Sequence, residues 1–179
     1  CSFGRTSMWS VLPFGLLLLS GSPLLAEPGR LTIGAVQFRI SEELFLSEAA
    51  FRSSVEAKVA EAVAAGSELV VFPEYTGVFL AALPHGAQVR SSNSVADAFR
   101  RIAATAVPVS SLREFFLAAA PEVSRRMDRI FGGLAAEYGV HVLGGTYFDD
   151  STGDSGEPRL TNRAVLYGPA GERVYEQDK

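Results

Sequence analysis

Cysteine is almost absent from this sequence, and histidine is scarce. The 179 residues contain one cysteine, Cys1, and two histidines, His85 and His141, which lie far apart. A single thiol excludes an internal disulfide framework and a cysteine-rich zinc site, and two isolated histidines offer no metal-ligand spacing. We therefore predict that the chain binds neither a metal nor a cofactor.

An excess of positive charge is also missing. The chain has 16 lysines and arginines against 20 aspartates and glutamates, a net charge of −4 at pH 7, which favours neither nucleic acid nor an anionic membrane surface. Hydrophobic residues make up 47% and charged residues 20%, which is the usage of a globular domain with a sizeable core. We predict no nucleic-acid partner.

No apolar run is long enough to cross a bilayer, so we predict no stable membrane span. The apolar stretch Val11 to Leu19 follows Met8, the first plausible start, and leads through small residues to Ala26 and Glu27. This order is typical of a secretory signal peptide cleaved after Ala26. We expect residues 1–26 to direct export, periplasmic or secreted, and residues 27–179 to fold; a buried N-terminal strand or helix is the alternative.

The first half of the remaining chain predicts a βαβ unit. Residues 31–38 and 69–72 are short, apolar and partly β-branched, as buried strands are. Between them an apolar stripe at helical spacing runs from a possible N-cap, Ser47, to Gly66, where a left-handed C-terminal cap belongs. Strands joined by such a helix are parallel, so we predict an α/β fold.

Farther along the chain the pattern is less regular at 84–121. This stretch contains two possible helices and could be a lid over a pocket, an oligomer contact or a local packing insert. The features predicted after it are a helix from Pro121 to Gly139, a strand at 140–143 closed by Gly144 and Gly145, a polar loop at 149–158, and a β-hairpin whose strands at 162–167 and 172–175 flank a type I turn at 168–171.

Glu74 is the residue that points most directly to chemistry. It follows Pro73 immediately after the carboxyl end of the strand predicted at 69–72, where open α/β sheets place ligand-contacting groups. Because proline fixes its own φ, the carboxylate would be presented from a stiff turn and could serve proton transfer. The alternative on position alone is a solvated glutamate in a loop.

Four motifs in this order resemble the opening of the nitrilase, or carbon–nitrogen hydrolase, superfamily. They are Gly34-Ala35-Val36-Gln37, Val71-Phe72-Pro73-Glu74, the segment Gly139 to Gly145, and the hairpin formed by Asn162 to Leu166 and Pro169 to Glu172. The resemblance covers roughly residues 31–80 and 132–179. It implies an α-β-β-α sandwich, incomplete in this chain, and a homo-oligomer.

The resemblance further implies a Glu–Lys–Cys site that hydrolyses non-peptide C–N bonds. On this mapping Glu74 is the general base and Lys179 stabilises negative charge on the intermediate. The family's nucleophilic cysteine follows the lysine, so it is absent from this chain, and Cys1 precedes the signal segment and cannot replace it. We expect the full-length protein to act on a small amide, in preference to a nitrile, and the chain alone to be inactive.

Two other interpretations stay open. One is a catalytically silent nitrilase-like module used for binding or assembly. The other is an unrelated exported α/β ligand-binding domain, in which Glu74 and Lys179 would lie far apart in space.

Overall fold

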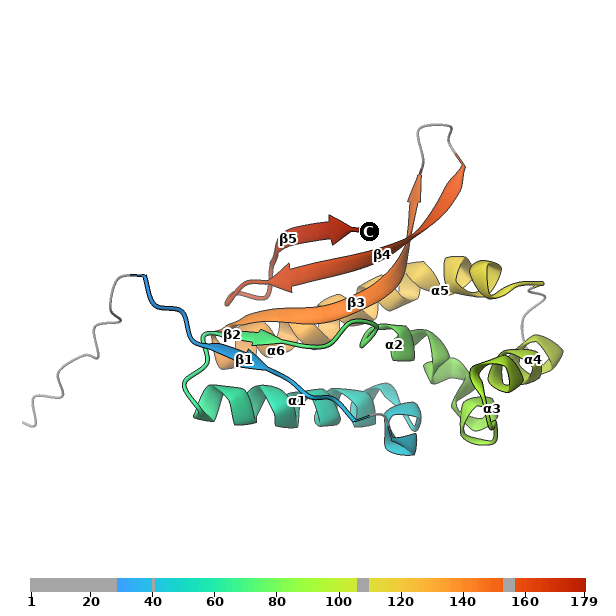
Figure 1. Ribbon diagram of the computed structural model, residues 1–179, viewed down its shortest axis with the longest axis horizontal. Coiled ribbons are helices and arrows are strands. Elements are labelled where there is room, and N and C mark those ends of the chain that lie inside the picture. The colour runs from blue at the N-terminus through green and yellow to red at the C-terminus, as the bar shows by residue number, and fades with distance from the viewer. Residues whose placement is uncertain (1–28, 40, 106–109, 153–156) are drawn as a thin grey trace, which may run out of the picture. The chain divides into compact units, whose positions relative to one another are not determined.

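The unit formed by Leu31–Lys179 contains a five-stranded mixed sheet covered by helices, which confirms the predicted α/β class. The computed structural model describes residues 29–39, 41–105, 110–152 and 157–179, so the predicted signal peptide lies outside the described residues. The strands lie in the order of the chain (Figure 1): β1 Ile33–Ala35, β2 Leu69–Val71, β3 His141–Thr152, β4 Pro158–Tyr167 and β5 Arg173–Asp178.

The helices of this unit are α-helical except for two 3-10 segments and one π segment. They are η1 Glu42–Phe45, α1 Glu48–Ala64, α2 Val78–Ala82, η2 Leu83–His85, α3 Gly86–Arg90, α4 Val95–Thr105, α5 Leu112–Met127, the π segment η3 Asp128–Gly132, and α6 Gly133–Tyr138. In the part of the chain that the structure describes, none of them is long and apolar enough to span a membrane.

The predicted βαβ unit is confirmed. The hydroxyl oxygen of Ser47 accepts a hydrogen bond from the backbone nitrogen of Ala50 at 3.1 Å and so caps α1, and Gly66 follows the helix in the left-handed region at φ 85°. β1 and β2, on either side of α1, pair in parallel, and β2 pairs in parallel with β3. β3, β4 and β5 continue the sheet as antiparallel neighbours.

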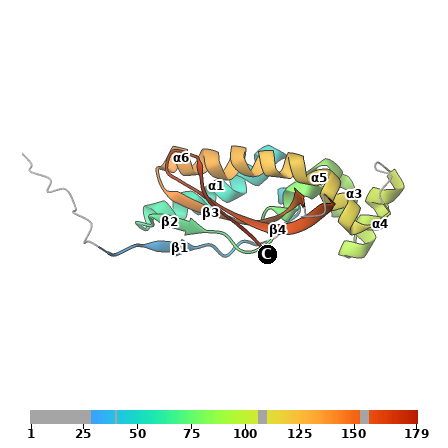
Figure 2. The ribbon, with the colours of Figure 1, turned by 90° about the horizontal axis from the view of Figure 1, so that it is seen from above.

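The core lies between the sheet and the helices α1, α5 and α6, which cover one of its faces (Figure 2). The fully buried side chains of this layer are Phe51, Val55 and Val59 of α1, Met127, Ile130, Phe131 and Leu134 of the α5–α6 segment, and Val70, Val142, Tyr147, Val165 and Tyr167 of the sheet. The unit thus contains one helical layer and one sheet of the expected four-layer sandwich.

The predicted helix start at Pro121 is wrong, because α5 begins nine residues earlier, at Leu112. Ser111 supplies the N-cap, since its hydroxyl accepts from the backbone nitrogen of Glu114 at 3.2 Å. Pro121 lies inside the helix, where it removes a backbone donor. The neighbouring Ala120 is fully buried, so tertiary packing offsets the lost hydrogen bond. The predicted end at Gly139 is confirmed by its φ of 65°.

The predicted end of the third strand at Gly144 and Gly145 is also wrong. β3 continues to Thr152 through a shift of register between Leu143 and Thr146, so part of the predicted polar loop is strand. Such a bulge adds one residue and reverses which side chains face the core. Val142 faces the helices before the bulge, and Tyr147 faces them after it.

The described part of 84–121 packs against the rest of the unit. His85 and Ile102 are buried, the guanidinium of Arg90 donates to the carbonyl oxygen of Phe45 at 3.0 Å, and the ring of Phe116 lies 4.6 Å from that of Phe148. This is the arrangement expected of a packing insert. The lid and the oligomer contact stay hypotheses.

Candidate active site

The loop that carries Glu74 is fastened to β3 just beyond the bulge. The backbone nitrogen of Tyr75 donates to the hydroxyl oxygen of Thr146 at 2.9 Å, and the backbone nitrogen of Gly77 donates to the carbonyl oxygen of Thr146 at 3.0 Å. Tyr75 itself lies in the left-handed region at φ 65°, which is unusual for a bulky residue and is typical of functional sites. The turn therefore holds Glu74 at a defined place beside β3.

Gly145 makes this close approach possible. Its φ is 75°, and a Cβ atom at this position would collide with the carbonyl oxygen of Pro73. Only glycine fits both conditions without strain. Gly145, one of the two glycines predicted to end the strand, therefore lets β3 approach the Pro73–Glu74 turn.

Lys179 directly follows β5 and is paired with Asn162 of β4. The backbone nitrogen of Lys179 donates to the carbonyl oxygen of Asn162 at 3.1 Å, and the backbone nitrogen of Asn162 donates in return at 3.4 Å. Side chains of directly opposed residues lie on the same face of a sheet. The next pair along the ladder, Arg163 with Asp178, faces the helices, so Asn162 and Lys179 face away from them.

The two residues predicted for the site lie together. The Nζ atom of Lys179 is 3.7 Å from Oε1 of Glu74, and the side chains are 81% and 47% exposed. Asn162 is a third member that the sequence did not reveal: its Nδ2 donates to the same Oε1 atom at 2.9 Å. The only sequence signal was that Asn162 opens the hairpin motif.

Aromatic side chains adjoin this cluster. The ring of Tyr75 lies 5.9 Å from that of Phe148, which in turn lies 4.6 Å from that of Phe116. Phe148 is directly opposite Asn162 in the β3–β4 ladder, so it shares a face with the candidate site. Tyr75, Phe148 and Phe116, which we call the aromatic row, offer an apolar surface beside the charged groups.

The opposite face of the same strands holds a charged network. Arg163 donates to Asp149 at 2.7 Å and to both carboxylate oxygens of Asp178 at 2.7 and 2.9 Å. The bond from Arg163 lowers the pKa of Asp178 from its usual value. Burial raises the pKa of Asp149, and the charge of Arg163 opposes that rise. The network ties β3 to the residue that precedes Lys179.

Arg173 anchors the start of β5 to the helical layer. It donates to both carboxylate oxygens of Asp128 at 2.6 and 2.8 Å and to the hydroxyl oxygen of Ser124 at 2.8 Å. The phenol of Tyr167 donates to the same Asp128 at 3.0 Å, and its burial raises its pKa. β5 is therefore held at both ends by arginine–carboxylate contacts.

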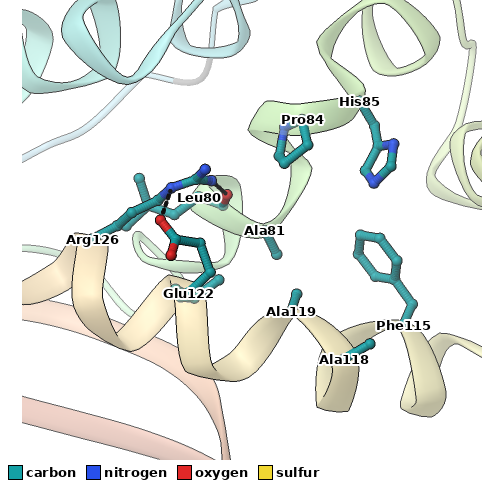
Figure 3. A pocket seen from close by; sticks show the side chains of 10 residues that line it. Leu80, Ala81, Pro84, His85, Phe115, Ala118, Ala119, Glu122 and Arg126 are labelled. Atoms are coloured by element: carbon teal, nitrogen blue, oxygen red, sulfur yellow. Dashed lines mark hydrogen bonds and ion pairs between the residues drawn. The ribbon is translucent and has the colours of Figure 1, made fainter. Parts of the chain in front are cut away.

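A separate hollow of about 290 Å³ lies between α5 and the α2–η2 segment (Figure 3). It is lined mainly by apolar side chains, with His85 at one end, where burial lowers the pKa of the imidazole. At the other end Arg126 is paired with Glu122 at 3.1 Å and donates to the carbonyl oxygen of Leu80 at 2.9 Å. The hollow shares no lining residue with the Glu74 cluster.

Neither the Glu74 cluster nor the hollow beside α5 resembles a metal site. Among the described residues, no group of three or more histidine, cysteine, aspartate or glutamate side chains could hold a metal ion. The donors around Glu74 are an amide and an ammonium group, which bind a carboxylate or a developing anion rather than a cation. The chemistry that this arrangement supports is proton transfer beside a fixed positive charge.

No protein-family model matches the chain, and no curated protein does. Among solved structures, a carbon–nitrogen hydrolase from Helicobacter pylori G27 matches with a TM-score of 0.49 and 16% identity, over 83% of this chain and 39% of that one. An amidase from Nesterenkonia sp. matches at 0.46 and 16%, over 88% and 46%. A mutant of the Nesterenkonia AN1 amidase, described as from the nitrilase superfamily, matches at 0.47 and 14%, over 87% and 45%.

This chain spans less than half the length of each of these proteins. The solved structures that this chain resembles are described as a carbon–nitrogen hydrolase and as amidases, one of them from the nitrilase superfamily.

Proposed function

We propose that this chain supplies the general base and the cationic group of a carbon–nitrogen hydrolase that acts on a small amide. Glu74 is the base and Lys179 the cation. The observation that carries the proposal is that these two side chains, from segments far apart in the sequence, meet at 3.7 Å. In the alternative interpretation, an unrelated ligand-binding domain, the two side chains would lie far apart in space.

The weakness of this ion pair supports a chemical role. With side chains 47% and 81% exposed, the pair contributes little to folding, because exposed ion pairs stabilise proteins by about 0 to 1 kcal/mol. Meanwhile the turn at Tyr75 is held in an unfavourable conformation by contacts with β3. Strain that presents a carboxylate beside an ammonium group is understandable at a reaction centre.

In the reaction we propose, a cysteine from sequence that follows Lys179 is the nucleophile. Glu74 takes the thiol proton as the sulfur attacks the amide carbon, and the carbonyl oxygen, which gains the electron pair, is stabilised by the ammonium of Lys179. Collapse breaks the C–N bond, Glu74 returns the proton to the leaving amine, and a thioester remains. Glu74 then takes a proton from water, whose oxygen attacks the thioester, and the carboxylic acid leaves with the thiol restored.

The test uses the protein encoded by the complete reading frame. Glu74→Gln and Lys179→Met should each lower kcat/KM for ammonia release from a panel of small amides by about a hundredfold or more. Glu43→Gln and Lys58→Met are matched controls. Glu43 is exposed, Lys58 is half-exposed on the surface of α1 and is the other of the two lysines, and both are distant from the site in the sequence. Near-normal turnover by Glu74→Gln would remove the assignment of the base.

Export and homo-oligomerisation belong to the same proposal. Export rests on the pattern of residues 1–26, and homo-oligomerisation rests on the family resemblance. Fractionation of cells that express the complete reading frame and light scattering of the purified protein test them.

A further inference from the structure

Asn162 connects the two proposed catalytic side chains. Its Nδ2 donates to Oε1 of Glu74 at 2.9 Å, and its backbone exchanges two hydrogen bonds with Lys179. We propose that Asn162 is a positioning residue that fixes the carboxylate of Glu74 through one oxygen and leaves the other free to move a proton. This inference rests on the proposed function of Glu74.

The orientation of the carboxamide follows from its surroundings. The reverse orientation would set the amide oxygen against a carboxylate oxygen, so that two acceptors would face each other at hydrogen-bond distance. In the orientation described, Nδ2 faces Glu74 and Oδ1 points into the protein. The hydrogen bond from Asn162 and the ion-pair contact of Lys179 both come to Oε1, and no described residue donates a hydrogen bond to Oε2.

The amide oxygen of Asn162 is buried and has no hydrogen-bond partner among the described residues. Buried acceptors without a partner are rare because they lose their bonds to water and gain none in return. A residue kept for stability alone would be better replaced by an apolar one at this position. The unpaired oxygen is therefore best explained by a need for the amide nitrogen, which is the group that holds Glu74.

The location of Asn162 gives the contact its precision. Asn162 lies within β4, with Phe148 of β3 opposite on one side and Lys179 opposite on the other. Arg163, the next residue, is tied to Asp149 and Asp178 on the helical face. A donor on a strand held in this way can fix a carboxylate more closely than a donor on a loop.

The experiment compares Asn162→Leu, Asn162→Asp and the exposed-site control Asn93→Leu in the full-length enzyme. Asn162→Leu removes both the donor and the unpaired acceptor, so it should leave Tm unchanged or higher and still lower kcat by about ten- to a hundredfold. Asn162→Asp sets a second carboxylate against Glu74, so the acidic limb of the pH–rate profile should move to higher pH. Asn93→Leu should change neither.

Two further measurements separate the possible failures. In a Glu74→Gln background, Asn162→Leu should cause no further loss, because a positioning residue acts through the group that it holds. In proton–nitrogen spectra of this chain, the side-chain amide signals of Asn162 should shift as Glu74 titrates, and Glu74→Gln should abolish the shift.

Normal kcat in Asn162→Leu, or amide signals that do not follow Glu74, would overturn the role of Asn162 while leaving Glu74 as the base. Full activity of Glu74→Gln would instead remove the proposed function. A loss of activity in Asn162→Leu that only follows a fall in Tm would show that the residue is structural.

Discussion

Replacing Arg163 by methionine is expected to destabilise the chain in a way that depends on pH. Arg163 is the cationic partner of Asp149, whose side chain is only 6% exposed, at 2.7 Å. Removing one member of a buried pair costs about 3 to 5 kcal/mol, because the other charge is left without compensation. Asp149 keeps weaker contacts to the phenol of Tyr147 and the backbone of Asp150, so we expect about 3 kcal/mol at pH 7.

Protonation of Asp149 sets an upper limit on this loss. Without Arg163, burial remains the largest influence on the carboxyl, whose pKa is already raised, and only the hydrogen bonds from Tyr147 and Asp150 oppose it. Keeping it neutral in the folded state costs about 1.4 kcal/mol for each pH unit above its usual value, which is about 4 kcal/mol at pH 7 and about 1.5 kcal/mol at pH 5. Because the loss of Arg163 raises the pKa of Asp149 further, the folded variant binds this proton more tightly than the folded native chain does. The variant therefore gains stability relative to the native chain as the pH falls from 7 to 5.

Urea unfolding followed by circular dichroism at both pH values measures these losses. Arg159→Met, an exposed arginine of the same strand, should change the free energy of unfolding by no more than about 0.5 kcal/mol. The double variant Arg163→Met/Asp149→Asn should recover most of the loss at pH 7, since no buried charge remains. A loss that is equal at pH 5 and pH 7, or one below about 1 kcal/mol at pH 7, would refute the reasoning.

Two more predictions concern the surroundings of Glu74. Gly145→Ala should lower the free energy of unfolding by about 2 kcal/mol or more, because alanine is strained at a positive φ and its Cβ would collide with the carbonyl oxygen of Pro73. Gly133→Ala is the control: this glycine lies in a helix with open space around it, so the same urea measurement should show no loss. Phe148→Ala should raise KM for amides of aromatic acids about tenfold more than KM for acetamide in the full-length enzyme, and equal changes would exclude the aromatic row from substrate binding.

The features that sequence predicted well depend on local chemistry. The cap at Ser47, the left-handed Gly66 and the turn at 168–171 each follow from a few neighbouring residues, and the structure has all three, including the bond from Gly171 to Gly168 at 2.8 Å that closes the turn. Parallel pairing of β1 and β2 follows because a helix joins them. Because such local patterns locate the helices and strands, they also predict the α/β class.

The features that sequence missed depend on distant contacts. Pro121 is a good helix start by local rules, but burial of the residues around it keeps it inside α5. Gly144 and Gly145 are good strand terminators, but here they form a bulge, because Pro73 lies close enough to require a glycine. The role of Asn162 was missed for the same reason: its motif can be seen in the sequence, but its contact with Glu74 cannot.

The bulge at Gly144 and Gly145 determines which residues of β3 lie on each face of the sheet, and so it determines which of them adjoin the candidate site. Because it adds one residue to β3, Tyr147 and Asp149 face the helices while Thr146 and Phe148 face the opposite side. Without the extra residue these assignments would be exchanged, since side chains alternate with a period of two. Thr146 could then no longer hold the turn of Glu74. The position of the proposed base therefore depends on two glycines of another strand.

Successive residues of β4 also lie on opposite faces of the sheet. Asn162 faces Glu74, and the adjacent Arg163 faces the charged network that binds Asp178, the neighbour of Lys179. The site and its anchor are thus built from alternate residues of one pair of strands. It follows that substitutions in the network should disturb Lys179 through β5 and loosen the Asn162–Glu74 contact through β4. A slip of register between β4 and β5 would separate the base from the cation altogether.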